Sequence, residues 1–277
     1  MQNHPQKLCK HSPRPKPRSP QSSSSAKNRH EVIENRNRIE LDQKQGFLEF
    51  MTATDDKTIV KDYFNATGFD RWRRIYGDGE VNKVQLDIRQ GHQRTVDTVL
   101  EWLIADGNLA ELSICDAGCG VGSLSIPLAE QGATVFASDI SEKMVGEAKE
   151  RAQATLGQAN NPTFAVQDLE SLSGKYHTVI CLDVLIHYPQ DKAMEMITHL
   201  SSLAGSRVLI SFAPKTFAYS LLKKIGELFP GPSKTTRAYL HKEVDIVRAL
   251  EANGWTIKRN AMTKTRFYFS RLLEAAR

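Results

Sequence analysis

Three glycines alternate with other residues directly after the first segment that is typical of a buried strand. That segment, Leu112–Asp116, ends on an acid, and Gly118, Gly120 and Gly122 follow at every second position. Glycines allow a tight turn and let a ligand approach the main chain closely. A stretch with helical spacing comes next, and the free N–H groups at the start of a helix attract anionic groups. The spacing therefore predicts a nucleotide-binding turn between a strand and a helix.

The position of the third glycine distinguishes two classes of ligand. A dinucleotide-binding loop follows the pattern G-x-G-x-x-G/A, and the residue at its third glycine position here is Ser123. Asp116 and Gly122 fit D-x-G-x-G-x-G instead, so the segment resembles the nucleotide loop of class I methyltransferases. The resemblance implies an enzyme that binds S-adenosylmethionine through Asp116 and the three glycines.

Further acids follow the second and third predicted strands, where this family has them. Asp139 ends the second strand, 23 residues after Asp116, and Asp168 follows the third. The resemblance implies that Asp139 holds the ribose hydroxyls and that Asp168 meets the adenine amine. Taken singly, Asp139 could be a helix N-cap and Asp168 a turn residue, but these alternatives together do not explain the spacing. The other cofactor-binding residues that the resemblance implies nearby are Ser141, Met144 and Leu169.

The segment after the fourth predicted strand contains a candidate for the chemical step. His187 is the one nitrogen base in residues 179–189, and Asp183 precedes it. In class I methyltransferases the residues after this strand face the transferable methyl group, which implies a catalytic role for His187. Asp183 is expected to orient the cofactor. The alternative for His187 is a histidine that packs a loop or lies on the surface.

An aromatic, arginine-rich stretch, residues 68–92, precedes the glycine loop. Trp72 and Tyr76 could lie against a flat ring, and neighbouring arginines such as Arg73 could face carboxylates. We therefore expect an anionic, flat and apolar ligand, with Trp72 and Arg73 among the residues that bind it. The alternative is an amphipathic arm that packs over the domain.

Short, β-branched strands alternate with helices from residue 112 onward, which is typical of a parallel sheet covered on both faces. The last two strands have only residues 263–265 between them, so they form a hairpin. We predict an α/β fold with a doubly wound, Rossmann-like, seven-stranded sheet that is mostly parallel and has an antiparallel C-terminal hairpin strand. The predicted strands are 112–116, 134–138, 163–166, 177–182, 207–212, 255–262 and 266–273, and the predicted helices are 124–131, 143–156, 193–203 and 242–253.

Composition divides the chain into three regions. Residues 1–30 contain seven Lys/Arg and no Asp/Glu, so residues 1–50 are predicted to be a disordered extension, and a transit peptide is an alternative. Residues 51–108 are predicted to be an N-terminal helical arm, and residues 109–277 the methyltransferase domain. An apolar segment at about 215–241 is too long for a plain connection. It is predicted to be a helical lid that offers Phe217 to the substrate, or else a helix packed on the core.

Charge and cysteine usage exclude several classes of protein. The net charge is +5, but residues 1–50 hold 10 Lys/Arg and 5 Asp/Glu, so the rest carries 27 of each sign. A body without basic excess argues against nucleic acid as a partner. No apolar run approaches the length of a membrane span. The four cysteines form no CxxC pair, which disfavours a disulfide framework and a zinc site.

Residues 68–92, the segment Ser211-Phe-Ala-Pro-Lys-Thr and the predicted lid together resemble the magnesium-protoporphyrin IX O-methyltransferases over about residues 55–277. The resemblance implies methylation of one propionate of magnesium-protoporphyrin IX in chlorophyll biosynthesis. It also implies transient contact with the porphyrin-binding subunit of magnesium chelatase and peripheral contact with photosynthetic membranes, on the cytoplasmic or stromal side. A carboxylate needs no strong base at pH 7, so His187 or Tyr76, as catalytic residues, would orient the carboxylate or touch the magnesium.

Two other functions are compatible with the same cofactor residues. One is a class I methyltransferase of another small molecule, such as a quinone or a phenol. The other is a scaffold that binds S-adenosylmethionine without catalysis, although the intact set of glycines and acids disfavours it.

Overall fold

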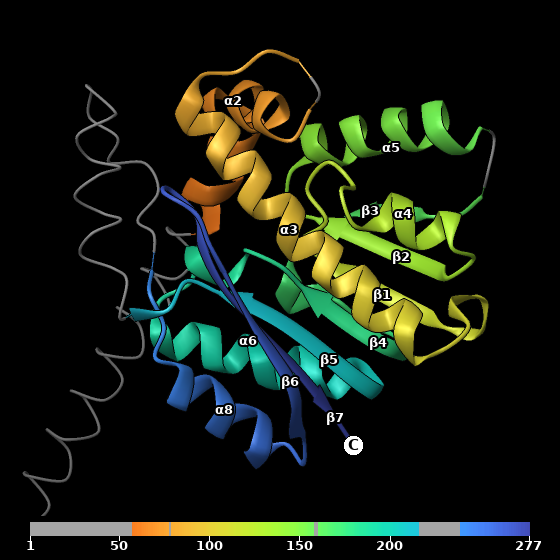
Figure 1. Cartoon of the computed structure of the whole chain (residues 1–277), viewed down its shortest axis with the longest axis vertical. Helices are drawn as coiled ribbons and strands as arrows, with labels where there is room; N and C mark the ends of the chain where they lie inside the picture. The colour runs from red at the N-terminus through yellow and green to blue at the C-terminus, as the bar shows by residue number, and fades with distance from the viewer. Residues whose placement is uncertain (1–56, 78, 158–159, 216–238) are drawn as a thin grey trace, which may run out of the picture. The chain divides into compact units, whose positions relative to one another are not determined.

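One mixed sheet forms the centre of the part of the chain that the computed structural model describes, which is residues 57–77, 79–157, 160–215 and 239–277 (Figure 1). Its strand order is β3-β2-β1-β4-β5-β7-β6. Because β1 lies between β2 and β4, the chain winds outward first on one side and then on the other, which confirms the predicted doubly wound topology. The strands are β1 (Ser113–Ala117), β2 (Thr134–Asp139), β3 (Thr163–Val166), β4 (Tyr176–Cys181), β5 (Ala204–Phe212), β6 (Thr256–Lys264) and β7 (Phe269–Ala276).

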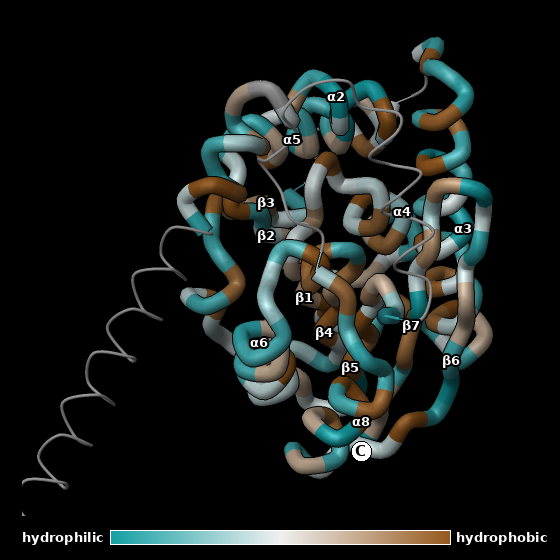
Figure 2. Tube along the Cα trace, turned by 90° about the vertical axis from the view of Figure 1, so that its left-hand side faces the viewer, coloured by the Kyte–Doolittle hydropathy of each residue, from teal (hydrophilic) through white to brown (hydrophobic). Residues whose placement is uncertain are grey.

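The central strands place alternate side chains in two hydrophobic cores, one on each face of the sheet. Val179 and Cys181 of β4 contribute to one core, whereas Ile180 and the following Leu182 contribute to the other. This period of two is expected of a strand that is buried on both faces. In Figure 2, β1, β4 and β5 are largely hydrophobic and lie inside a layer of helices with many hydrophilic stretches.

Helices cover both faces. Buried residues of α3 and α4, such as Val96 and Leu128, pack into one core, and those of α6 and α8, such as Ile197 and Ile246, pack into the other. Every strand and helix predicted between residues 112 and 212 is found, with ends that differ by at most three residues. The helices are α2 (Thr67–Ile75), α3 (Lys83–Asp106), α4 (Ser125–Glu130), α5 (Glu142–Leu156), α6 (Gln190–Leu203) and α8 (Glu243–Ala252), with short 3-10 helices η1 (Leu109–Glu111), η2 (Leu169–Ser171) and η3 (Leu185–His187).

The C-terminal hairpin is found, and its turn lies later than predicted. β7 pairs antiparallel with both β5 and β6, and residues 265–268 connect the two hairpin strands. The Asp87 carboxylate of α3 accepts hydrogen bonds from Thr265 Oγ1 at 2.6 Å and from Phe267 N at 2.7 Å. This contact with a distant helix fixes the position of the turn. The prediction from local spacing was wrong because it could not include such a contact.

The segment before the sheet is helical, as predicted, but its last helix is longer than expected. Residues 57–65 are helical and α2 follows. Apolar spacing predicts a third helix over about residues 89–103, whereas α3 begins at Lys83. Asn82 and Gln85 form a capping box at the start of α3, which stabilises a polar first turn that the apolar spacing missed. The division into arm and domain stays a prediction. The predicted extension 1–50 and nearly all of the predicted lid lie outside the described residues.

Candidate cofactor and substrate site

The carboxyl ends of β1, β2, β3 and β4 meet at one edge of the sheet, so the loops that follow them lie together. The glycine loop follows β1, Asp139 ends β2, and Asp168 and Asp183 follow β3 and β4. The strand order reverses between β1 and β4, and ligands of open α/β sheets bind in the crevice at such a switch point. The structure thus brings the predicted cofactor residues to one place.

The glycine loop turns sharply over the end of β2. The N–H groups of Gly118 and Cys119 both donate to Ser138 O at 2.8 Å, and Gly120 N donates to Asp139 Oδ2 at 3.0 Å. Gly118, Gly120 and Gly122 all have positive φ, which only glycine adopts without strain. A side chain on Gly120 would meet no atom within 4 Å, so the loop leaves open space for a ligand there.

Gly118 also allows the loop after β4 to come close. A Cβ at this position would lie 2.2 Å from Val184 Cγ2, and φ is +87°. We expect Gly118→Ala to lower the free energy of unfolding by about 2–4 kcal/mol, because strain and overpacking add. Gly146→Ala is the matched control, since a Cβ at this α5 position meets no atom within 4 Å and alanine should stabilise the helix by about 0.5–1 kcal/mol. Urea unfolding measures both, and equal effects would contradict this account of the loop.

Two carboxyl groups, those of Asp116 and Asp139, lie at the loop. Asp116 is buried and accepts a hydrogen bond from Ser125 Oγ at 2.5 Å, and burial raises its pKa to about 6. Burial likewise raises the pKa of Asp139 to about 6, although backbone N–H donors oppose the shift. A desolvated pair of acids favours a ligand that brings positive charge and hydroxyl donors. The sulfonium and ribose of S-adenosylmethionine supply both, so these residues fit that cofactor.

The raised pKa values predict how cofactor binding depends on pH. An acid with a pKa of about 6 is ionised above pH 6 and protonated below it, and only the ionised Asp139 accepts two hydroxyl hydrogen bonds. The dissociation constant for S-adenosylmethionine should therefore be flat between pH 7 and 8 and rise by up to about tenfold per unit below pH 6. Calorimetry across this range checks the prediction. A constant affinity down to pH 5 would show that the acids do not hold the cofactor.

The other residues expected around the adenine have structural partners as well. Ser141 caps α5 by accepting from Met144 N at 3.2 Å and donates to Asn65 Oδ1 at 2.7 Å. Asp168 caps η2 and lies 2.9 Å from Lys57 Nζ. Burial would raise the pKa of Asp168, but Lys57 and the Ser171 N–H group hold it below its ordinary value. Met144 and Leu169 are buried nearby. The N-cap of α5 is thus Ser141, so the alternative of Asp139 as this N-cap is wrong, and the cofactor contacts of these residues stay predictions.

A continuous row of aromatic rings joins the loop after β4 to the N-terminal helices. The Phe64 ring meets His187 edge-on at 5.3 Å between centroids and lies 6.4 Å from Trp72, which stacks on Tyr76 at 5.4 Å. The row ends at His92, 4.5 Å from Tyr76. Trp72 and Tyr76 are therefore in one cluster with His187, which lies far from them in the sequence.

The protonation states in this row are set by burial. Burial lowers the pKa of His187 to about 4, and burial together with the charges of Asp183 and Asp139 raises the pKa of Tyr76 well above its usual range. At pH 7, His187 is neutral and Tyr76 keeps its proton. His187 Nδ1 and Trp72 Nε1 are buried and have no hydrogen-bond partner among the described residues. Such groups are rare in folded proteins, and here they suit polar contacts to a bound molecule.

Two arginines hold Tyr76 in place through the main chain. Arg89 of α3 donates to Ile75 O at 2.8 Å and to Arg74 O at 2.7 Å, and Arg151 of α5 donates to Tyr76 O at 2.6 Å. These guanidinium groups satisfy free carbonyls at the end of α2, where positive charge is favoured.

The structure does not bring Arg73 into the row of rings. Its side chain is half exposed, lies 3.8 Å from Glu147 of α5, and covers the Phe69 ring. The amphipathic spacing of α2 puts Arg73 on a different side from Trp72 and Tyr76, so its expected contact with the substrate has no support from this arrangement. Phe217 lies outside the described residues.

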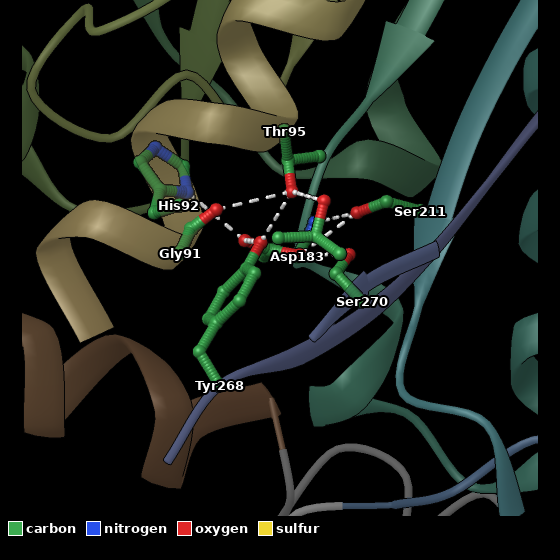
Figure 3. Close-up of polar contacts among 8 residues, drawn as sticks. Gly91, His92, Thr95, Asp183, Ser211, Tyr268 and Ser270 are labelled. Atoms are coloured by element: carbon green, nitrogen blue, oxygen red, sulfur yellow. Dashed lines mark hydrogen bonds and ion pairs between the residues drawn. The ribbon is translucent and has the colours of Figure 1, made fainter. Parts of the chain in front are cut away.

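Sequence reasoning missed the residues around Asp183. Its carboxylate accepts hydrogen bonds from His92, Tyr268, Ser211 and Ser270 (Figure 3). These donors come from α3, β5 and the C-terminal hairpin, and no spacing pattern in the sequence links them. Within the described ranges, no helix is both long and apolar enough to cross a bilayer, and no cluster of three or more His, Cys, Asp or Glu side chains could bind a metal ion.

Known proteins match this chain over most of its length. The family described as "Magnesium-protoporphyrin IX methyltransferase C-terminus" matches residues 181–277, and the family "Methyltransferase domain" matches residues 114–204. Magnesium-protoporphyrin O-methyltransferase of Synechocystis sp. (strain PCC 6803) is 69% identical over 225 residues, which is 81% of this chain and 98% of that protein. The chloroplastic magnesium protoporphyrin IX methyltransferase of Arabidopsis thaliana is 62% identical over 221 residues, which is 79% of this chain and 71% of that protein.

Solved structures agree with these relatives. The crystal structure of magnesium protoporphyrin IX methyltransferase from Synechocystis PCC 6803 with bound S-adenosylhomocysteine matches with a TM-score of 0.73 at 67% identity, covering 80% of this chain and 99% of that one. The structure with bound S-adenosylmethionine matches with a TM-score of 0.72 at 62% identity, covering 80% and 97%. With this identity, over nearly the full length of a relative, the chain belongs to the family of magnesium-protoporphyrin IX O-methyltransferases, on the α/β fold of the S-adenosylmethionine-dependent methyltransferases.

Proposed function

We propose that this chain transfers a methyl group from S-adenosylmethionine to a propionate carboxylate of magnesium-protoporphyrin IX, which gives the monomethyl ester in chlorophyll biosynthesis. The observation that carries the proposal is 69% identity over 225 residues to a magnesium-protoporphyrin O-methyltransferase. The row of rings from His187 to His92, beside an acidic cofactor site, supports it because a flat, anionic macrocycle suits apolar and aromatic contacts with few charges.

The residues at the carboxyl edge of the sheet would hold the cofactor. S-adenosylmethionine supplies a methyl group on a positively charged sulfur. Asp139 would accept hydrogen bonds from the ribose hydroxyls, and the buried Asp116 would complement the positive charge. Gly118, Gly120 and Gly122 let the main chain approach the cofactor, and Ser141, Met144, Asp168 and Leu169 would line the adenine.

His187 and Tyr76 would position the acceptor carboxylate. This carboxylate is already ionised at pH 7, so the reaction needs no base, and the protein must align oxygen, methyl carbon and sulfur while excluding water. Tyr76, which keeps its proton, can donate to a carboxylate oxygen. A neutral His187 can donate to the carboxylate or bind the magnesium through a ring nitrogen. The proposal includes both of these roles for His187.

We also propose transient contact with the porphyrin-binding subunit of magnesium chelatase and peripheral contact with photosynthetic membranes, on the cytoplasmic or stromal side. The poor solubility of the planar substrate supports direct transfer between proteins. The Arabidopsis relative is named chloroplastic. Co-purification of the two proteins with magnesium-protoporphyrin, and flotation with liposomes, test the two contacts separately.

A binding screen distinguishes this function from its nearest alternative. We expect magnesium-protoporphyrin IX to change the porphyrin absorption band on binding and to be methylated, while quinone and phenol acceptors of other class I enzymes are not. Methylation of a quinone or phenol without methylation of the porphyrin would overturn the proposal. Cofactor binding without turnover of any of these acceptors would favour a scaffold.

A further inference from the structure

The Asp183 carboxylate has no acceptor position left for a cofactor. His92 Nδ1 and Tyr268 Oη donate to its Oδ2 at 2.9 and 2.6 Å, and Ser211 Oγ and Ser270 Oγ donate to its Oδ1 at 2.8 and 3.1 Å. An ionised carboxylate has about four lone-pair positions, so these four donors fill it. Burial would raise the pKa of Asp183, but the hydrogen bonds from His92, Tyr268 and Ser211 hold it below its ordinary value. Asp183 therefore has no free oxygen lone pair for the cofactor contact that was expected of it.

The arrangement around Asp183 is fixed from several sides. Asp183 has a φ of +57°, the one positive value of a non-glycine residue in the described ranges, and such strain persists only where the surroundings enforce it. A Cβ on Gly91 would lie 2.4 Å from Tyr268 Cδ1, and Thr95 Oγ1 lies 3.1 Å from Tyr268 Oη. Helix α3 and the C-terminal hairpin are thus in close contact over this carboxylate (Figure 3).

His92 connects Asp183 to the proposed substrate site. Its Nδ1 faces the carboxylate, and Figure 3 shows the second ring nitrogen pointing away from it. The ring contacts Tyr76 with 4.5 Å between centroids and 44° between planes. An ionised carboxylate on Nδ1 fixes both the tautomer and the orientation of an imidazole. The Tyr76 ring therefore contacts both the Trp72 ring and an anchored imidazole.

We propose that His92, held by Asp183, is a positioning residue that sets the orientation of the Tyr76 hydroxyl toward the acceptor carboxylate. The inference rests on the proposed function for its chemistry, because Tyr76 is the group that would meet the substrate. In this proposal His92 and Asp183 act without touching the substrate or the cofactor. Their effect on the rate passes through the placement of Tyr76, and a small displacement of a positioning group costs a large factor in rate.

A double-mutant cycle on the full chain tests this path. His92→Phe keeps a ring beside Tyr76 and removes the donor to Asp183. We expect it to lower kcat for magnesium-protoporphyrin about 10- to 100-fold, with the dissociation constant for S-adenosylmethionine unchanged. In a Tyr76→Phe background the same substitution should lower kcat by less than about twofold, because coupled residues are not additive. Full additivity, an equal loss of cofactor affinity, or wild-type turnover of Tyr76→Phe would overturn the proposal.

Two further variants distinguish a positioning role of His92 from a role in folding. His92→Asn keeps an amide donor for Asp183 but loses the ring, so it should retain the melting temperature of the wild type and still lose turnover; full turnover would overturn the proposal. His199→Phe is the matched control. His199 lies on α6 and contacts Leu172 O at 3.0 Å, so its loss should leave kcat unchanged. A drop in kcat as large as that of His92→Phe would show that the effect is not specific to His92 and would overturn the proposal.

A spectroscopic readout keeps the test independent of the substrate. In protein with ¹³C-labelled tyrosine, the Tyr76 ring resonance is the one lost in Tyr76→Phe. Asp183→Asn, which weakens the anchor of His92, should shift or broaden this resonance. Tyr268→Phe, which removes a different donor from the same carboxylate oxygen, should leave it nearly unchanged. An unchanged Tyr76 resonance in Asp183→Asn would overturn the proposal even if the chain methylated a different acceptor.

Discussion

Asp139→Ala should weaken the binding of S-adenosylmethionine by about tenfold to a thousandfold. Two hydrogen bonds from ribose hydroxyls would be lost and partly replaced by water, which leaves a net loss of about 1.4–4 kcal/mol in total. The substitution also removes the acceptor of Gly120 N and Ser141 N, so the glycine loop loses an anchor at the same time. Calorimetry on the purified variant measures the change in affinity.

A neighbouring acid provides the control for this experiment. Glu142, in the first turn of α5, is exposed and lies three residues after Asp139, and Glu142→Ala should leave the affinity unchanged. Asp139→Asn keeps one acceptor oxygen and should fall between the wild type and the alanine variant. Unchanged affinity in a folded Asp139→Ala variant would remove Asp139 from the cofactor site.

His187→Ala and Tyr76→Phe should each lower turnover by about 10- to 1000-fold, which corresponds to about 1.4–4 kcal/mol of barrier. The size of this effect is motivated by the protonated hydroxyl of Tyr76 and by the buried Nδ1 of His187, which has no hydrogen-bond partner in the described ranges. The affinity for S-adenosylmethionine should hardly change, because neither residue belongs to the glycine loop. Turnover and cofactor affinity are therefore measured on the same preparations.

A histidine at the opposite end of β4 gives the matched control. His177 hydrogen-bonds to Thr178 near the start of the strand, so His177→Ala should keep its turnover. A comparison with metal-free protoporphyrin then separates the two possible roles. A variant that has lost a magnesium ligand should lose its preference for the metallated substrate, whereas one that has lost only a carboxylate contact should keep the preference at a lower rate. Full turnover of both His187→Ala and Tyr76→Phe would contradict the proposed site.

The sheet and the cofactor edge could be predicted from sequence because their signals are local. A strand buried on both faces needs a short apolar run, and a loop with φ values of +87°, +53° and +82° needs the glycines that stand there. The acids that end or follow β2 and β3 were found for the same reason, since a fixed spacing from strand to acid places them at one edge. The helical character of the segment before the sheet also came from local apolar spacing.

Contacts between distant segments could not be predicted from local sequence patterns. The donors to Asp183 come from residues as far apart as His92 and Ser270, and each resembles an ordinary surface or packing residue in its own stretch. The guanidinium group of Arg73 suits a substrate carboxylate, but the orientation of α2 turns this side chain toward Glu147. The side of a helix that faces a site depends on tertiary packing, which the spacing of one segment does not specify.

Transfer of an isotopically labelled methyl group tests the central claim most directly. The purified chain is incubated with methyl-labelled S-adenosylmethionine and magnesium-protoporphyrin IX, and the porphyrin product is separated and analysed by mass. The proposed function predicts one labelled methyl ester on a propionate, formed with repeated turnover and abolished when the propionates are esterified beforehand. Unlabelled porphyrin at the end of the reaction, from folded protein that binds S-adenosylmethionine, would contradict it.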